Sequence, residues 1–224
     1  RSSAASDVYK RQMKKLFLGL GLVAGTFAFA QTMSTTTSTS RPMFGIKAGI
    51  NVASLSDDGF DDTTSKVGFA GGVFMNAPLS EQFSIQPEVM YSQMGSEVEG
   101  QYANTHYSTK LNLDYITVPV MFQFKATPEF YIEAGPEFGF LVSAKSKDTV
   151  GNFSATNEID TDYFNSFNFG LGLGLGFDIT ENFGVNARYV AGFTDINKDG
   201  ETSLQNEDNK NRNNTFQAGV YFKF

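Results

Sequence analysis

Residues 167–179 read FNFGLGLGLGFDI, and this stretch decides the fold class. Each odd position carries Phe, Leu or Ile, and each even position carries Asn, Gly or Asp. Because successive side chains of a β-strand point to opposite faces, the segment has one wholly apolar face and one face that is small or polar. The stretch therefore predicts a strand whose apolar face is buried in hydrocarbon or in a protein core.

The same period of two recurs along the chain after Pro42. It is strong at residues 183–193 and 216–224, and weaker at 43–52, 66–77, 82–94, 110–125 and 129–143. Each of these eight segments reaches the roughly 9–11 residues that a tilted membrane-spanning strand needs. A soluble β-sandwich also alternates, but its strands usually run for about five or six residues. The faces opposite the Phe and Leu side chains carry Gly or charge, which favours membrane strands over a sandwich.

The gaps between these segments alternate in length. They are long at 53–65, 95–109, 144–163 and 194–214, and short at 78–81, 126–128 and 180–181. Outer-membrane barrels have short periplasmic turns and longer outside loops. Since hydrocarbon offers no water to an unpaired backbone amide, a spanning sheet must also close on itself. Residues 43–224 are therefore predicted to form an all-β, eight-stranded antiparallel up-and-down transmembrane β-barrel, with both mature termini in the periplasm and four polar loops outside. Pro87, Pro119 and Pro136 fall within strands, so we expect them at bulges or near strand ends.

The segment before the barrel has the features of a targeting signal. Residues 13–30, MKKLFLGLGLVAGTFAFA, combine a basic start, a short apolar run and a small-x-small cleavage site, so we expect a cleavable signal peptide. Residues 1–12 precede Met13 and are expected to be a non-native leader. Residues 31–42 are rich in Ser and Thr and are expected to be a linker.

Composition excludes several functional classes. The 224 residues contain no Cys, a single His, 24 acidic and 17 basic side chains, and a net charge of −7. A disulfide scaffold, a thiol enzyme and a Cys- or multi-His-ligated metal centre are therefore excluded. The acidic balance argues against a nucleic-acid partner, which needs a basic face.

Two further segments carry a family resemblance. LDYITVPVMFQF from Leu113 and FYIEAGPEFGF from Phe130 resemble the PorT-like outer-membrane β-barrel domain family, over roughly residues 44–224. The resemblance implies an eight-stranded barrel in a Gram-negative outer membrane, and its namesake belongs to a protein-secretion apparatus. The last strand also looks like the assembly signal of such barrels, with Phe224, Phe222 and Val220 at alternate places. The resemblance thus implies outer-membrane lipid, the barrel-assembly machinery and secretion-complex proteins as partners.

An eight-stranded barrel is just wide enough for side chains to fill it. By alternation, five charged side chains point inward near mid-height: Lys47, Glu88, Glu133, Glu137 and Arg188. Because isolated buried charges are costly, we expect these groups to pair, with Tyr131, Gln86 and Asn186 as hydrogen-bonding neighbours. Gly170, Gly172, Gly174 and Gly176 would leave room for larger side chains opposite. A plugged structural core is favoured, and a proton or ion path is the alternative.

Two acidic loops could bind cations. Residues 195–207 begin like a calcium loop, with Asp195, Asn197 and Asp199 at alternate positions before Gly200. The twelfth position is Asn206 rather than Glu, and Glu207 comes one residue late, so a calcium site and a solvated acidic loop both stay open. The DDGFDD run at 57–62 could likewise chelate divalent ions that it shares with anionic lipid headgroups.

No feature points clearly to catalysis. The single His106 lies in the second long gap beside Thr105, Tyr107 and Ser108, and hydroxyl residues are abundant throughout. The sequence therefore favours a non-enzymatic outer-membrane barrel with a structural or surface-interaction role. The alternatives are a component or docking platform of a secretion or transport machine and, less favoured, a loop-borne hydrolase that uses His106.

Overall fold

The computed structural model describes residues 41–56, 65–102, 105–150, 153–161, 164–196 and 212–224. The chain divides into two units, Arg1–Arg41 and Pro42–Phe224. The leader, signal peptide and most of the linker predicted above lie outside the described residues, so the account that follows concerns the second unit. In the described part of the chain, no helix is long and apolar enough to cross a membrane.

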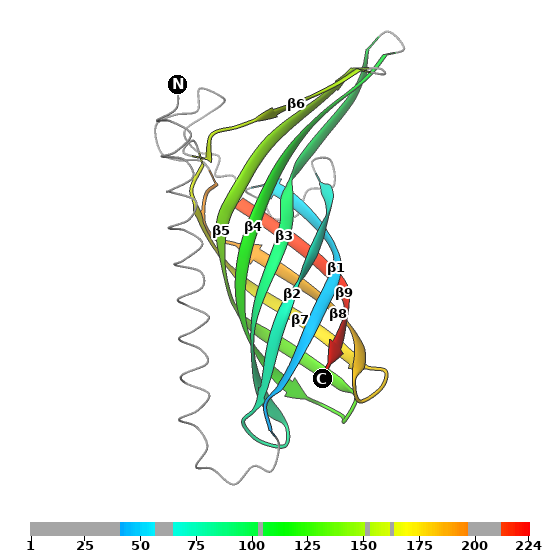
Figure 1. Ribbon diagram of the computed structural model, residues 1–224, viewed down its shortest axis with the longest axis vertical. Helices are drawn as coiled ribbons and strands as arrows, with labels where there is room; N and C mark the ends of the chain where they lie inside the picture. Colours follow the sequence, from blue (N-terminus) through cyan, green and yellow to red (C-terminus); the bar gives the residue numbers. More distant parts are fainter. Residues whose placement is uncertain (1–40, 57–64, 103–104, 151–152, 162–163, 197–211) are drawn as a thin grey trace. The chain divides into compact units, whose positions relative to one another are not determined.

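The second unit is a closed antiparallel ring of eight strands with one extra short strand (Figure 1). The strands are β1 (Met43–Ser56), β2 (Lys66–Pro78), β3 (Phe83–Tyr102), β4 (Thr105–Lys125), β5 (Phe130–Val150), β6 (Phe153–Glu158), β7 (Phe167–Asp178), β8 (Phe183–Gly192) and β9 (Arg212–Lys223). Neighbours in the ring follow the order β4-β3-β2-β1-β9-β8-β7-β5, and a β4–β5 pairing closes it. The extra strand β6 pairs with the far end of β5. The predicted fold class, an eight-stranded up-and-down barrel, is confirmed.

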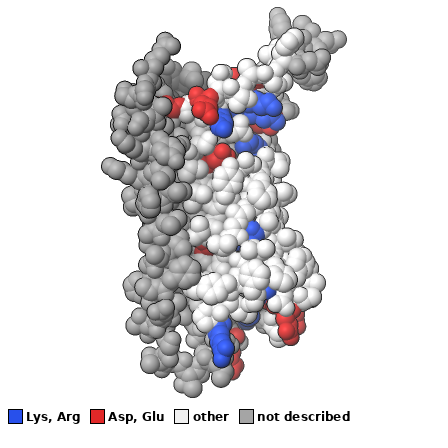
Figure 2. Space-filling view, viewed as in Figure 1, with Lys and Arg blue, Asp and Glu red and all other residues white. Residues whose placement is uncertain are grey.

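The wall of the ring separates an apolar outside from a polar inside. Along β7 the outward side chains Leu171, Leu173 and Leu175 are 48%, 67% and 49% exposed, although they are among the most apolar in the chain. The inward side chains of the other strands include buried Lys, Glu, Arg, Asn and Gln. Figure 2 shows a largely uncharged band between charged side chains near the two ends. This inversion of the usual soluble pattern is what a barrel wall in lipid requires.

Two of the predicted long loops are wrong. Residues 95–102 of β3, 105–112 of β4 and 145–150 of β5 continue as strands in the gaps expected at 95–109 and 144–163, and β6 adds a fourth strand. We call these four segments the projecting sheet, because they extend beyond the ring (Figure 1). Polar and charged side chains occur on both faces of this sheet, such as Lys147 and Asp148 at adjacent positions, beside the exposed Tyr107, Val150 and Phe153, so it lacks the strict alternation that identifies a membrane strand. Cross-strand polar contacts stabilise it instead, such as the Lys110–Glu97 ion pair and the 3.0 Å hydrogen bond from Thr109 Oγ1 to Asp148 Oδ1.

The expectation for the three strand prolines is also wrong. Pro87, Pro119 and Pro136 lie inside β3, β4 and β5, and the one register shift between β4 and β5 falls elsewhere, between Asp114 and Tyr115. Each proline stays in register with a neighbouring strand: Pro87 with Val120, Pro119 with Glu137 and Pro136 with Leu171. A proline removes one ladder donor, on one side only. The ring tolerates that loss in mid-strand because the other side remains paired.

The inward glycines of β7 make room for large side chains, as predicted. A Cβ added at Gly176 would lie 2.2 Å from Cζ of Tyr131, and one at Gly172 would lie 2.8 Å from Cε of Met121. At Gly174 the nearest side-chain atom would be Oε1 of Glu133, at 2.9 Å. These glycines therefore leave the space inside the barrel that the side chains of Tyr131, Met121 and Glu133 occupy.

Gly176→Ala should destabilise the barrel by about 1–3 kcal/mol, the usual cost of overpacking a filled interior. The Tyr131 ring is buried and must shift to accept the added methyl group. Urea unfolding in lipid vesicles, followed by circular dichroism, measures the loss. Gly71→Ala is the matched control, because the nearest atom to its Cβ would be the tip of the exposed Phe69 side chain, at 2.9 Å, and the backbone oxygen of Lys47 lies at an ordinary 3.7 Å. Equal stability of the two variants would contradict the packing argument.

Candidate functional site: the barrel interior

Four of the five predicted interior charges meet at one level of the barrel. Lys47 lies on β1, Glu88 on β3, Glu133 on β5 and Arg188 on β8. Strand alternation turns each of them inward, and each is at most 6% exposed. We call these four residues the charge network.

Arg188 is the centre of the charge network. Its Nη1 and Nη2 donate to Oε2 and Oε1 of Glu88 at 3.0 and 2.8 Å, and its Nε donates to Oε1 of Glu133 at 2.8 Å. Lys47 Nζ donates to Oε1 of Glu88 at 2.8 Å. Paired Arg–carboxylate forks are among the strongest polar contacts in proteins. With two cations and two carboxylates the charge network is neutral, which is how buried charges become tolerable.

Side-chain amides extend the charge network toward the end of the barrel where short turns join the strands. Gln86 Nε2 donates to Oε1 of Glu88 at 2.9 Å, as predicted for Gln86. Gln123 Nε2 donates to Oε2 of Glu133 at 3.0 Å, and Asn76 Nδ2 donates to the side-chain oxygens of both Gln86 and Gln123. Sequence reasoning missed Gln123 and Asn76. Both occupy inward places by alternation, so a search for inward amides as well as charges would have found them.

Three predicted members stand apart from the charge network. Glu137 makes no hydrogen bond or ion pair with any described residue, and its buried Oε2 has no partner there. Oδ1 of Asn186 is likewise unpartnered among the described residues. Tyr131 packs instead in an aromatic cluster with Phe74 and Tyr221.

Packed side chains fill the barrel on both sides of the charge network. The cluster of Phe74, Tyr131 and Tyr221 lies toward the short-turn end. Toward the opposite end, the buried cluster consists of Ala53, Met94, Leu113, Tyr115, Leu141, Ala144 and Ile196. This arrangement is that of a filled core, with polar groups held between two apolar layers.

Most residues of the two candidate cation loops lie outside the part of the chain that the structure describes. The DDGFDD run, Asn197, Asp199 and Glu207 lie outside the described residues. Asp195 is described, and its backbone forms an isolated bridge with Arg212. Within the described ranges, no group of three or more His, Asp or Glu side chains could hold a metal ion.

The remaining candidate residues lie on the outward face of the last strand or in the projecting sheet. Val220, Phe222 and Phe224 are 44%, 43% and 71% exposed, on the outward face of the last strand. His106, expected in a loop, belongs to β4 and is paired with Gln101 across the hairpin.

The chain is similar in sequence to one family of outer-membrane proteins and in structure to several solved barrels. A sequence model of the family described as "Outer membrane protein beta-barrel domain" matches residues 29–198. Among solved structures, similar chains include Ail, the attachment invasion locus protein of Yersinia pestis (16% identity, 83% of this chain and 100% of that chain, TM-score 0.44). Neisserial surface protein A (17%, 83% and 100%, TM-score 0.48) and the N-terminal β-barrel domain of Pseudomonas aeruginosa OprF (12%, 82% and 100%, TM-score 0.35) are also similar. No curated protein matches the sequence.

Proposed function

Because the chain belongs to the outer membrane protein β-barrel domain family, we propose that it is a non-enzymatic surface protein whose closed barrel anchors the projecting sheet outside the cell. The observation that carries this proposal is the projecting sheet itself. The ring closes through the parts of β3, β4 and β5 that lie outside the projecting sheet, such as residues 113–125 of β4 paired with residues 131–144 of β5. The projecting sheet is therefore not needed to close the barrel.

The filled interior argues for an anchor rather than a channel. The charge network and the two apolar clusters occupy the cross-section at successive levels. An eight-stranded barrel encloses little more space than its own side chains need. A barrel with a filled interior can contact partners outside the membrane only through the loops and strand extensions at its two ends.

The projecting sheet has the features of an interaction surface. Its edge strand β6 pairs with β5, and all six of its residues are exposed. Among the described residues, the pairing of β3 with β2 ends at Ser92, so residues 95–102 of β3 form the other edge of this part of the sheet. Strand edges offer unpaired backbone groups to a binding partner. In this proposal the projecting sheet faces the outside medium, and the short turns and both mature termini face the periplasm.

The test is surface cross-linking with a membrane-impermeant reagent, followed by pull-down of the tagged protein from solubilised membranes. The key variant replaces residues 98–109 with Asn-Gly, which joins the paired residues Glu97 and Lys110 through a two-residue hairpin turn. We expect wild type to capture a surface partner and the shortened variant to lose it, because much of the projecting sheet is gone. An unheated sample should still migrate differently from a boiled one, which shows that the barrel has folded.

A charge-swapped variant, Glu97→Lys with Lys110→Glu, is the matched control, since it keeps the hairpin and its ion pair. Capture of the same partner by the shortened variant would refute the surface-interaction role. A stable envelope assembly that survives the shortening would favour the alternative, a docking platform of a secretion machine. Lipid or peptide hydrolysis lost in His106→Ala would favour a hydrolase.

A further inference from the structure

Glu137 is a buried carboxylate that no cation pairs among the described residues. The two buried lysines outside the charge network are engaged elsewhere, because Lys66 donates to the Met94 carbonyl oxygen and Lys223 pairs with Asp178. The charge network is neutral by itself, with Lys47 and Arg188 against Glu88 and Glu133. Glu137 is 4% exposed and has no ion-pair partner among the described residues. A buried carboxylate without a partner is costly, so a positive charge has to reach it, either as a proton or as a cation.

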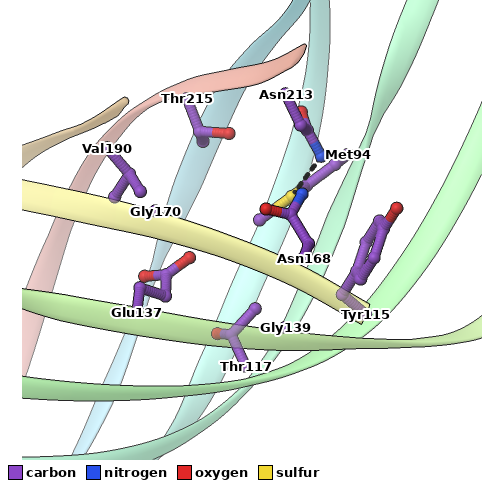
Figure 3. Close-up of a pocket in the computed structure, with 10 residues that line it drawn as sticks. All are labelled: Met94, Tyr115, Thr117, Glu137, Gly139, Asn168, Gly170, Val190, Asn213 and Thr215. Carbon is purple, nitrogen blue, oxygen red and sulfur yellow. Dashed lines mark hydrogen bonds between the residues drawn. The ribbon is translucent and has the colours of Figure 1, made fainter. Parts of the chain in front are cut away.

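A small cavity lies beside this carboxylate, between the charge network and the apolar cluster that contains Met94 and Tyr115. Its lining residues come from β3, β4, β5, β7, β8 and β9: Met94, Tyr115, Thr117, Glu137, Gly139, Asn168, Gly170, Val190, Asn213 and Thr215 (Figure 3). It leaves about 10 Å³ for the centre of a water molecule, close to the space that one water needs. The cavity can therefore hold one small guest.

Several residues that line this cavity carry a buried oxygen atom without a protein partner in the described part of the chain. Among the described residues, Oε2 of Glu137, Oγ1 of Thr117, Oγ1 of Thr215 and Oδ1 of Asn213 are buried and make no hydrogen bond. The amide nitrogen of Asn213 is already used, because it donates to the sulfur of Met94 at 2.8 Å (Figure 3). Carboxylate, amide and hydroxyl oxygens form the ligand set that hard cations prefer.

We propose that this cavity binds a single monovalent metal cation of the size of sodium, with Glu137 as the charged ligand and Thr117, Thr215 and Asn213 as neutral oxygen ligands. One positive charge would balance Glu137, the buried carboxylate that no described cation pairs. A divalent ion would leave an excess positive charge in a poorly solvated interior that also contains Arg188. An anion would meet the carboxylate of Glu137, and Arg188 is already engaged by Glu88 and Glu133.

Two glycines keep the space for the guest open. A Cβ at Gly170 would lie 2.8 Å from Cγ1 of Val190, and one at Gly139 would lie 3.3 Å from Cβ of Asn168. A side chain at either position would crowd a neighbour that lines the cavity. The charged groups that face Glu137 from the other strands are Arg188, Lys47 and Glu88, all within the neutral charge network.

The test compares the heat stability of the full chain, refolded in detergent, in sodium chloride and in N-methylglucamine chloride of equal concentration. The folded fraction is read from the gel shift between unheated and heated samples. A ligand that binds only the folded state shifts the unfolding equilibrium by the factor 1 + [L]/Kd, about elevenfold at ten times Kd. We expect sodium to raise the folded fraction of wild type by this factor at a given temperature. Sodium should not raise the folded fraction of Glu137→Gln, which keeps the shape of the side chain and removes its charge.

Glu181→Gln is the matched control, since Glu181 is an exposed carboxylate in a short turn and should leave sodium protection unchanged. Thr117→Val with Thr215→Val provides a second variant should Glu137→Gln fail to fold, and it should weaken sodium protection without removing the carboxylate. Infrared spectra separate a cation from a proton, because only a protonated Glu137 has the carbonyl stretch of a carboxylic acid. Equal sodium protection in wild type and Glu137→Gln, or a protonated band in wild type in both salts, would overturn the proposal.

Discussion

Replacing Arg188 with Met should lower the free energy of unfolding by about 3–5 kcal/mol, the loss expected when one partner of a buried ion pair is removed. Arg188 donates to both Glu88 and Glu133, so its loss leaves two buried carboxylates with only Lys47 to balance them. Because Met has a similar length and no charge, the loss reports electrostatics more than volume. Urea unfolding of the protein in lipid vesicles, followed by circular dichroism, measures it.

A compensating variant distinguishes charge balance from packing. Arg188→Met with Glu133→Gln removes one cation and one carboxylate, and leaves the 2.8 Å Lys47–Glu88 pair intact. We expect this double variant to recover a large part of the stability that Arg188→Met loses. A further loss on adding Glu133→Gln would show that shape, rather than charge, makes Arg188 necessary.

Leu173→Arg should destabilise the barrel in lipid by about 2–4 kcal/mol, the cost of a cationic side chain on the lipid face at mid-membrane depth. Leu173 lies near the middle of β7 and is 67% exposed on the outer face of the wall. The guanidinium would have to leave water or distort the bilayer. Denaturant titration of folded and unfolded protein in phosphatidylcholine vesicles gives the difference.

The matched control for this prediction is Ile179→Arg, at the short-turn end of the same outer face. Ile179 is 54% exposed, and a charge near the membrane interface should cost only about 0–1 kcal/mol. Both variants introduce the same cationic side chain on the outer face, so the difference between them reports chiefly how deep the charge lies in the bilayer. Equal and negligible effects would mean that water, and not lipid, surrounds the barrel wall.

The sequence predicted the spanning part of the fold because lipid on one side and a filled core on the other impose a strict period of two. The prediction for residues 167–179 was accurate to one residue, since β7 ends at Asp178. Beyond the membrane the same strands meet water on both faces. There the alternation disappears, and residues 95–109 were mistaken for a loop.

Prediction of the interior was limited in a different way. Alternation indicates which side chains point inward, so Lys47, Glu88, Glu133 and Arg188 could be grouped before their contacts were known. It does not fix the level of each side chain across strands that tilt and stagger. Glu137 was therefore grouped with the others, although the structure places it beside a separate cavity.

The projecting sheet also determines how the protein responds to mechanical load. Strands β3, β4 and β5 pass from the barrel wall into the projecting sheet as unbroken segments. A tether pulling on the tip, away from the membrane, would strain many backbone hydrogen bonds side by side, in shear, rather than unzip them in turn. Attachment through this end would thus transmit tension directly to the membrane-embedded wall.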